Sequence, residues 1–247
     1  MKVSIACLIF KSIPFLEFVK KEIDENTPML KTGEAEFYFV VNKGSGTLEQ
    51  NFNVIRYLKE NNIPHYIFDS DPSDTQPQPP YPLNIDYIYK AWNFAADNAK
   101  GEIIVFVNSD MAFYKDWLEN LLKRLNKNKA VSSLLVESGK VPSLLAHTVV
   151  KNFGRTPETF QRKRFEEFAE MLKEDTEQPY GPFMPVAIHK ENFIRAGGYP
   201  GNRRLNDGGM ISGDQILFHE RLASLGIKHT TSFDSVAYHM QLGEVDG

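Results

Sequence analysis

The first half of the chain alternates two hydrophobic patterns. Runs rich in apolar residues, which are typical of strands buried on both faces of a parallel sheet, occur at 3–10, 36–41, 64–68 and 103–107. Apolar residues at helical spacing occur from Pro14 onward, at 48–61 and at 85–99. Strand and helix thus alternate in the order that builds a parallel sheet with right-handed crossovers. The pattern predicts an α/β fold with a Rossmann-like, mostly parallel central sheet flanked by helices.

The second half repeats these patterns less regularly. We expect further helices at 117–125, from Thr156 and from Gln215, and further strands at 130–136 and 235–239. In the helix from Gln215, the side expected to be buried carries Ile216, Leu217, Ala223 and Leu225. Between Asp69 and Leu83, five prolines and almost no apolar residue predict a loop. Because the alternation of strand and helix resumes after this loop, we interpret 1–247 as one domain.

Composition and charge exclude some classes of protein. With 42% hydrophobic and 24% charged residues, the chain is ordinary for a globular protein. A net charge of −4 argues against binding driven by bulk electrostatics, so we expect no nucleic-acid partner. No apolar stretch approaches the ~20 residues that span a bilayer, and no signal peptide precedes the first strand. Together with a single cysteine, Cys7, these features predict a cytoplasmic protein without a transmembrane segment.

Polar residues directly follow the most apolar strand. The run 103–107 ends in Asn108, Ser109 and Asp110. Open α/β sheets bind ligands at the carboxyl ends of their strands, and oxygen ligands suit a hard divalent cation that carries substrate phosphates. The sequence therefore indicates a metal site at this point. The alternative is a strand that simply ends in a polar turn.

A literal Asp-x-Asp motif occurs elsewhere, at Asp69 and Asp71. Its strand is shorter and more polar, and the proline-rich loop that follows offers little to hold two carboxylates in place. Because metal ligands work best when packing locks their rotamers, we favour Asp110 as the metal-binding residue.

Two later segments carry further candidate chemistry. A glycine-rich loop at 196–200 precedes Asp214, which stands at the start of a predicted helix. A carboxylate there can cap the helix, accept a proton from a substrate, or do both. His239 follows the last predicted strand, and a single histidine in such a place is more often structural than a ligand.

The order of short segments along the chain is more specific than any one of them. Ala91-Trp-Asn93 is followed by Ala99-Lys-Gly-Glu102, by the strand that ends before Asn108-Ser-Asp110, and later by Gly198-Tyr199 and Gly213-Asp214. In this order they resemble the motifs of glycosyltransferase family 2, the inverting nucleotide-sugar transferases, and Asn108-Ser-Asp110 is similar to their Asn-x-Asp subgroup. The resemblance covers nearly the whole chain. It implies a single-domain glycosyltransferase A (GT-A) fold, with a nucleotide-binding half at 1–110 and an acceptor-side half at 111–247.

The resemblance also implies a division of roles. Asp110 and His239 would bind Mn²⁺ or Mg²⁺ across the diphosphate of a nucleoside-diphosphate sugar donor. Asp214 would deprotonate the hydroxyl of a carbohydrate or other acceptor as it attacks the anomeric carbon. These roles agree with the chemistry, since the leaving diphosphate gains negative charge and a sugar hydroxyl is a poor nucleophile. The residues expected to contact the donor are Asn42, Asn93, Asn108, Ser109, Arg203 and Arg204. For Arg203 and Arg204, which precede Asp214, the alternative is a solvated loop without a donor contact.

Four positions depart from the family pattern. Asn42 and Asn108 stand where aspartate is common, Trp92 replaces an arginine, and Gly213 replaces a glutamate. The two asparagines keep open a different class of protein, a catalytically silent module that binds nucleotide sugars. A nucleotidyltransferase is a further alternative, although it would favour a basic, glycine-rich first loop that residues 10–14 do not provide.

Overall fold

The computed structural model describes residues 2–42, 48–69, 85–142 and 145–241. Its strands are β1 (Val3–Ile9), β2 (Ala35–Asn42), β3 (His65–Phe68), β4 (Ile103–Val107), β5 (Met111–Phe113), β6 (Lys129–Glu137), β7 (Thr148–Val150), β8 (Glu177–Pro179), β9 (Val186–His189), β10 (Arg203–Arg204), β11 (Met210–Ile211) and β12 (Lys228–His239). Its α-helices are α1 (Ile13–Asn26), α2 (Met29–Thr32), α3 (Leu48–Glu60), α4 (Ile85–Asn98), α5 (Trp117–Arg124), α6 (Arg162–Leu172), α7 (Lys190–Arg195), α8 (Gly213–Gln215) and α9 (Leu222–Ser224).

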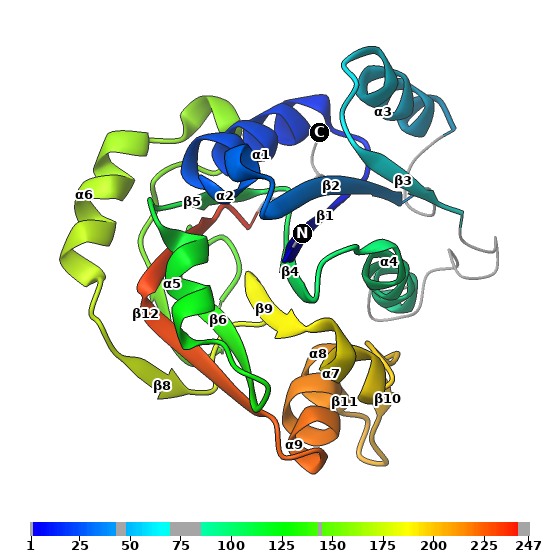
Figure 1. The fold of residues 1–247 in the computed structure, drawn as a ribbon, viewed down its shortest axis with the longest axis vertical. Helices are drawn as coiled ribbons and strands as arrows, with labels where there is room; N and C mark the ends of the chain where they lie inside the picture. Colours follow the sequence, from blue (N-terminus) through cyan, green and yellow to red (C-terminus); the bar gives the residue numbers. More distant parts are fainter. Residues whose placement is uncertain (1, 43–47, 70–84, 143–144, 242–247) are drawn as a thin grey trace.

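Ten of these strands form one central sheet. Their order is β3-β2-β1-β4-β9-β6-β12-β5, with β7 beside β6 and β8 beside β12 (Figure 1). Strands β3, β2, β1 and β4 are parallel to one another, as are β6 and β12. Strand β9 runs antiparallel to both β4 and β6. The expected α/β class with a mostly parallel sheet is therefore confirmed. β10 and β11 form a separate two-stranded hairpin.

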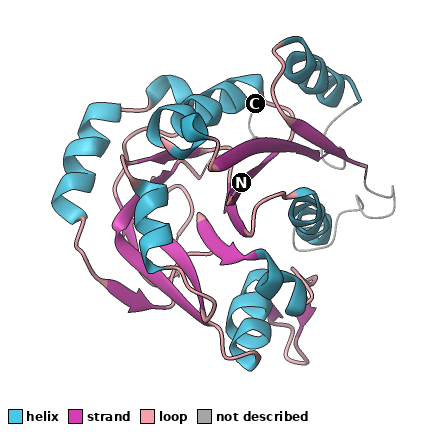
Figure 2. Cartoon of the chain, in the orientation of Figure 1, coloured by secondary structure: helices cyan, strands magenta, loops and turns pink. Residues whose placement is uncertain are grey.

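Helices cover both faces of the parallel strands because the side chains of each strand alternate between two cores. Ile5 and Cys7 pack into the core that contains α1, α3 and α5, whereas Ala6 packs into the core beneath α4 and α9. Figure 1 shows α1 and α3 on one side of β1 and β2 and α4 on the other, and Figure 2 shows helices around the whole sheet. All five residues of β4 are buried, as a central strand covered on both faces requires.

The structure corrects several boundaries in the second half. The helix expected from Thr156 begins only at Arg162, because Thr156 caps a separate 3₁₀ turn at Pro157–Thr159. β12 begins at Lys228, well before the expected strand at 235–239. The short elements β5, β7, β8, β9 and α7 were not predicted. Residues 43–47 and 70–84, which include most of the proline-rich loop, lie outside the described residues.

The helix that starts at Gly213 also differs from the expected regular helix. Residues Ile216–Arg221 form a π-helical segment between α8 and α9. A π-helical turn adds a residue and changes which side chains face inward. Consequently Leu222 is buried and Ala223 is exposed, the reverse of what the helical spacing predicted for Ala223.

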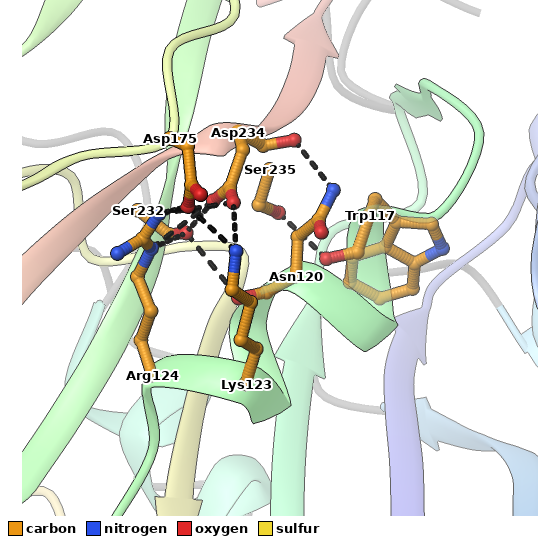
Figure 3. A network of polar contacts seen from close by, with 8 residues as sticks. All are labelled: Trp117, Asn120, Lys123, Arg124, Asp175, Ser232, Asp234 and Ser235. Carbon is orange, nitrogen blue, oxygen red and sulfur yellow. Dashed lines mark hydrogen bonds and ion pairs between the residues drawn. The ribbon is translucent and has the colours of Figure 1, made fainter.

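Strand β12 has an irregular pairing near its middle. Its pairing with β6 shifts register between Ser232 and Val236, which marks a bulge. Arg124, at the end of α5, donates to both carboxylate oxygens of Asp234 at 2.9 and 3.1 Å, and Asn120 donates to the Asp234 carbonyl at 2.8 Å (Figure 3). This polar network attaches the bulge to α5.

Candidate functional site

The end of β4 meets the end of β12. In the two ladders that β12 forms after its bulge, His239 lies opposite Met111 on β5 and opposite Glu137 on β6. The backbone N–H of Met240 donates to the carbonyl oxygen of Asp110 at 3.0 Å. These backbone contacts place His239 beside Asp110, the residue that ends the polar turn after β4.

The imidazole of His239 stands between two carboxylates. Its Nε2 lies 3.3 Å from Asp110 Oδ1, and its Nδ1 lies 3.6 Å from Glu137 Oε1. Asp110 and Glu137 are both nearly inaccessible to solvent. Burial alone would lower the pKa of His239, but the negative charges of Asp110 and Glu137 outweigh it and raise the pKa to about 10. The surroundings therefore favour positive charge at this position.

Asp110 and His239 fit a shared divalent cation. Adjacent ligands of an octahedral Mg²⁺, each about 2.1 Å from the ion, are roughly 3 Å apart. The distance of 3.3 Å between Asp110 Oδ1 and His239 Nε2 is close to that value. Within the described ranges, no group of three or more His, Cys, Asp or Glu side chains could hold a metal ion. Asp110 and His239 could supply two ligands, and a cation held by them would need water or donor phosphate oxygens for the rest.

Asp214 lies in the first turn of the helix that starts at Gly213. Ser212 occupies the capping position, and its hydroxyl accepts a hydrogen bond from the N–H of Gln215 at 3.2 Å. The capping role considered for Asp214 therefore belongs to Ser212. The Asp214 carboxylate instead accepts a hydrogen bond from the hydroxyl of Tyr89 at 2.8 Å. Burial raises the pKa of Asp214 to about 6, although this hydrogen bond opposes the rise, and a carboxylate of that pKa suits proton transfer near neutral pH.

These groups border one pocket of about 240 Å³. Asn108 from the end of β4, Glu137 from β6, Asp214 from α8 and His239 from β12 all line it. The other walls are mostly apolar and aromatic, with Tyr89 among them. Apolar walls with a few converging polar groups are typical of a small-molecule site. Asp110 does not line the pocket, but it contacts His239, which does.

Two other residues predicted to contact the sugar donor, Asn42 and Ser109, lie near the carboxyl ends of the parallel strands. Asn42 ends β2 and is buried, and its Oδ1 has no hydrogen-bond partner among the residues described. Ser109 is also buried. Strands β2 and β4 both run parallel to β1. Asn42, at the end of β2, and Asn108, directly after β4, therefore lie at the same carboxyl edge of the sheet. A buried amide oxygen without a partner is consistent with a ligand contact.

Two of the remaining residues predicted to contact the sugar donor, Asn93 and Arg203, form hydrogen bonds within the protein instead. Asn93 on α4 donates to the Tyr199 carbonyl at 2.9 Å and accepts from the Tyr199 N–H at 2.8 Å, so its amide holds the glycine-rich loop. Arg203 forms two hydrogen bonds with Glu220, at 2.9 and 2.5 Å. Arg204 is exposed on β10. Their donor contacts remain predictions.

Sequence reasoning missed Glu137 and Tyr89. Glu137 directly follows the predicted strand 130–136, so the rule that singled out Asn108 and Asp110 could have found it. Tyr89 lies among the apolar positions of α4, and its pattern carries no sign of its contact with Asp214, which is 125 positions away. Only the packing of α4 against the later segment brings them together.

Comparison with known proteins finds one family model and several solved structures. Residues 86–193 match the model of the family described as Glycosyl transferase family 2. Among solved structures, a mannosyltransferase from Pyrobaculum calidifontis in complex with GDP-mannose and Mn²⁺ has 17% identity and a TM-score of 0.58, covering 97% of this chain and 56% of that one. S. aureus TarS, residues 1–349, has 13% identity and a TM-score of 0.56, covering 97% of this chain and 60% of that one.

These similarities establish the fold as that of GT-A glycosyltransferases. The chain spans little more than half the length of either solved structure. No curated protein matches the sequence. In the part of the chain that the structure describes, no helix has the length and apolar character needed to cross a membrane.

Proposed function

We propose that the chain is a metal-dependent, inverting glycosyltransferase. It transfers a sugar from a nucleoside-diphosphate sugar to the hydroxyl of a carbohydrate or other acceptor. The observation that supports this most directly is that Asp214 lines the same pocket as His239, whose imidazole contacts Asp110. The site draws on both proposed halves of the domain, 1–110 on the donor side and 111–247 on the acceptor side.

On the donor side, Asp110 and His239 would hold Mn²⁺ or Mg²⁺. A divalent cation bound there would offset the negative charge that develops on the leaving nucleoside diphosphate, which can lower the barrier by several kcal/mol. A cation at Nε2 would have to displace the proton that this nitrogen carries in the charged imidazole, while Glu137, on the opposite side of the ring, would favour retention of the proton on Nδ1. The proposed donor contacts are Asn42 at the base, Asn108 and Ser109 at the sugar or ribose, Arg203 and Arg204 at the diphosphate, and Asn93.

On the acceptor side, Asp214 would act as the general base. It takes the proton from the acceptor hydroxyl while that oxygen forms a bond to the anomeric carbon. The bond between the anomeric carbon and the diphosphate oxygen breaks on the opposite face, so the configuration inverts. A positioned base contributes roughly 10²–10⁴ to the rate of such a step.

A screen of UDP-, dTDP- and GDP-sugars for metal-dependent hydrolysis tests this proposal. We expect one donor to release its nucleoside diphosphate only with Mn²⁺ or Mg²⁺, and Asp110→Ala to abolish that stimulation. Asp69→Ala is the matched control, because Asp69 belongs to the literal Asp-x-Asp motif yet is exposed at the end of β3. A loss of stimulation in Asp69→Ala but not in Asp110→Ala would mean that the metal site was assigned to the wrong carboxylate.

The same screen separates the alternative functions. A catalytically silent module would bind a nucleotide sugar by calorimetry without hydrolysing it and without needing a metal. A nucleotidyltransferase would form or consume pyrophosphate instead of releasing a nucleoside diphosphate.

A further inference from the structure

Tyr89 is held rigidly against the proposed base. Its hydroxyl donates to Asp214 Oδ2 at 2.8 Å, and its ring stacks on Tyr199 with centroids 5.4 Å apart and planes inclined by 19°. Both tyrosines are buried, with 5% and 3% of their surface exposed. Rotation of the Tyr89 ring is therefore restricted by stacking on its face and by the hydrogen bond at its tip.

The approach of Tyr89 depends on the glycine before Asp214. A Cβ atom at Gly213 would lie 2.7 Å from Cε2 of Tyr89 and 2.3 Å from the carbonyl oxygen of Pro200. Any larger residue at 213 would force one of these groups away. Gly213 stands where glutamate is common in the family that the sequence resembles, and the space of that side chain is taken here by the Tyr89 ring.

Helix α4, which carries Tyr89, also contacts the segment before Gly213 through Asn93. Asn93, one turn after Tyr89 on α4, makes the paired hydrogen bonds of 2.9 and 2.8 Å with the backbone of Tyr199. The N–H of Gly213 donates to Asn202 Oδ1 at 2.9 Å. Helix α4, the loop around Tyr199 and the helix start at Asp214 are thereby joined by specific contacts.

We propose that Tyr89 is a positioning residue for Asp214: it engages Oδ2 and fixes the carboxylate plane, so that Oδ1 takes the proton of the acceptor hydroxyl. This inference rests on the proposed role of Asp214 as the base. Tyr89 does not exchange a proton with the substrate. Its contribution is the orientation of the carboxylate and the stabilisation of its charged form.

The hydrogen bond from Tyr89 lowers the pKa of Asp214, in opposition to burial. Its removal in Tyr89→Phe should therefore raise the pKa of Asp214 above its present value. The other titratable groups that face Asp214 are the hydroxyl of Tyr199 and, across the pocket, Glu137 and His239. These three are unchanged in the variant, so a difference in titration reports the loss of the Tyr89 hydroxyl.

A ¹³C NMR titration of the full chain, labelled at aspartate carboxyl carbons, measures this without any substrate. The Asp214 resonance is the one absent from Asp214→Asn. We expect its midpoint to move upward by about one pH unit in Tyr89→Phe, as removal of one charge-assisted hydrogen bond implies. An unchanged midpoint would overturn the proposal.

Tyr38→Phe is the matched control. Tyr38 is also a buried tyrosine whose hydroxyl is bonded to α4, since it donates to the Ala95 carbonyl at 2.6 Å. Its removal perturbs the same helix without touching Asp214. An equal change of the Asp214 midpoint in both variants would contradict the direct role of Tyr89 and indicate a general loosening of α4.

Kinetics separates this inference from the proposed function. With GDP-mannose and Mn²⁺ as the probe, we expect Tyr89→Phe to lower kcat for hydrolysis about tenfold and to shift the acidic limb of its pH profile upward, with little change in KM. If Asp214→Asn retains wild-type turnover, the proposed base is wrong. If Asp214→Asn is inactive while Tyr89→Phe matches wild type in kcat and pH profile, only the role of Tyr89 fails.

Discussion

At the scale of single residues, burial and one hydrogen bond together adjust the reactivity of Asp214. A carboxylate that accepts a proton must be charged at the working pH and yet not too stable as an anion. Burial raises the pKa of Asp214 to about 6, and the Tyr89 hydroxyl limits the rise. The residue is thereby kept ionised at neutral pH while remaining a better base than an exposed aspartate.

Turnover should consequently fall as the pH drops through about 6, because protonated Asp214 cannot accept a second proton.

Asp214→Asn should spare donor binding, measured by calorimetry, but lower the rate at least a hundredfold, in keeping with the loss of a general base. A rate reduced only a few-fold would leave Asp214 with a structural role.

His239 should control the affinity for metal. His239→Ala removes one of two protein ligands, so we expect the Mn²⁺ concentration for half-maximal activity to rise by roughly 10–100-fold. His219→Ala is a suitable control, because His219 is an exposed histidine outside the lining of the pocket. Identical metal titrations for His239→Ala and the wild type would exclude His239 as a ligand.

At the scale of elements, the bulge in β12 connects a structural network to the site. Arg124 is mostly buried where it meets Asp234, whereas the neighbouring Lys123, which contacts the same carboxylate at 3.5 Å, is half exposed. Loss of a partly buried charge partner leaves Asp234 without its main cation. Because the strand after the bulge carries His239, we expect the network that holds the bulge to affect the position of His239 beside Asp110.

Arg124→Met should therefore lower the free energy of unfolding by roughly 2–4 kcal/mol, measured by urea denaturation, and should also weaken Mn²⁺ binding. Lys123→Met is the control, and we expect it to change stability little because its charge is exposed to solvent. Normal Mn²⁺ affinity in a folded Arg124→Met variant would show that the bulge does not position His239.

At the scale of the whole molecule, the candidate site joins distant parts of the chain. Asp110 belongs to the first half, and Glu137, Asp214 and His239 belong to the second. A ligand that contacts both halves binds the folded state only, so its binding free energy adds to the stability of the fold.

Mn²⁺ together with a nucleoside diphosphate at about 100 times its Kd should stabilise the protein by about 2.7 kcal/mol. For a chain of this size that corresponds to an increase in Tm of roughly 5–10 °C, measurable by calorimetry. We expect Asp110→Ala to lose the part of the increase that requires Mn²⁺. An equal increase in Asp110→Ala would place the metal elsewhere.

The sequence by itself determined the α/β class and most elements of the first half. Strands β1 to β4 and helices α1, α3 and α4 could be predicted because a central parallel strand must be apolar and each helix must carry one apolar stripe. The same reasoning singled out Asn108 and Asp110, since a polar break after a buried strand is a local feature. Asp214 and His239 were proposed because short segments in order resemble a known family.

Only the tertiary structure decided how these residues are arranged. The contact between His239 and Asp110 lies beyond a bulge that Arg124 contacts, and the contact between Asp214 and Tyr89 depends on a glycine that lets α4 approach. Both join residues more than a hundred positions apart, and no local pattern encodes such a pairing. Hydrophobic periodicity specifies which face of an element is buried, but the partner that covers it is selected by packing of the whole chain.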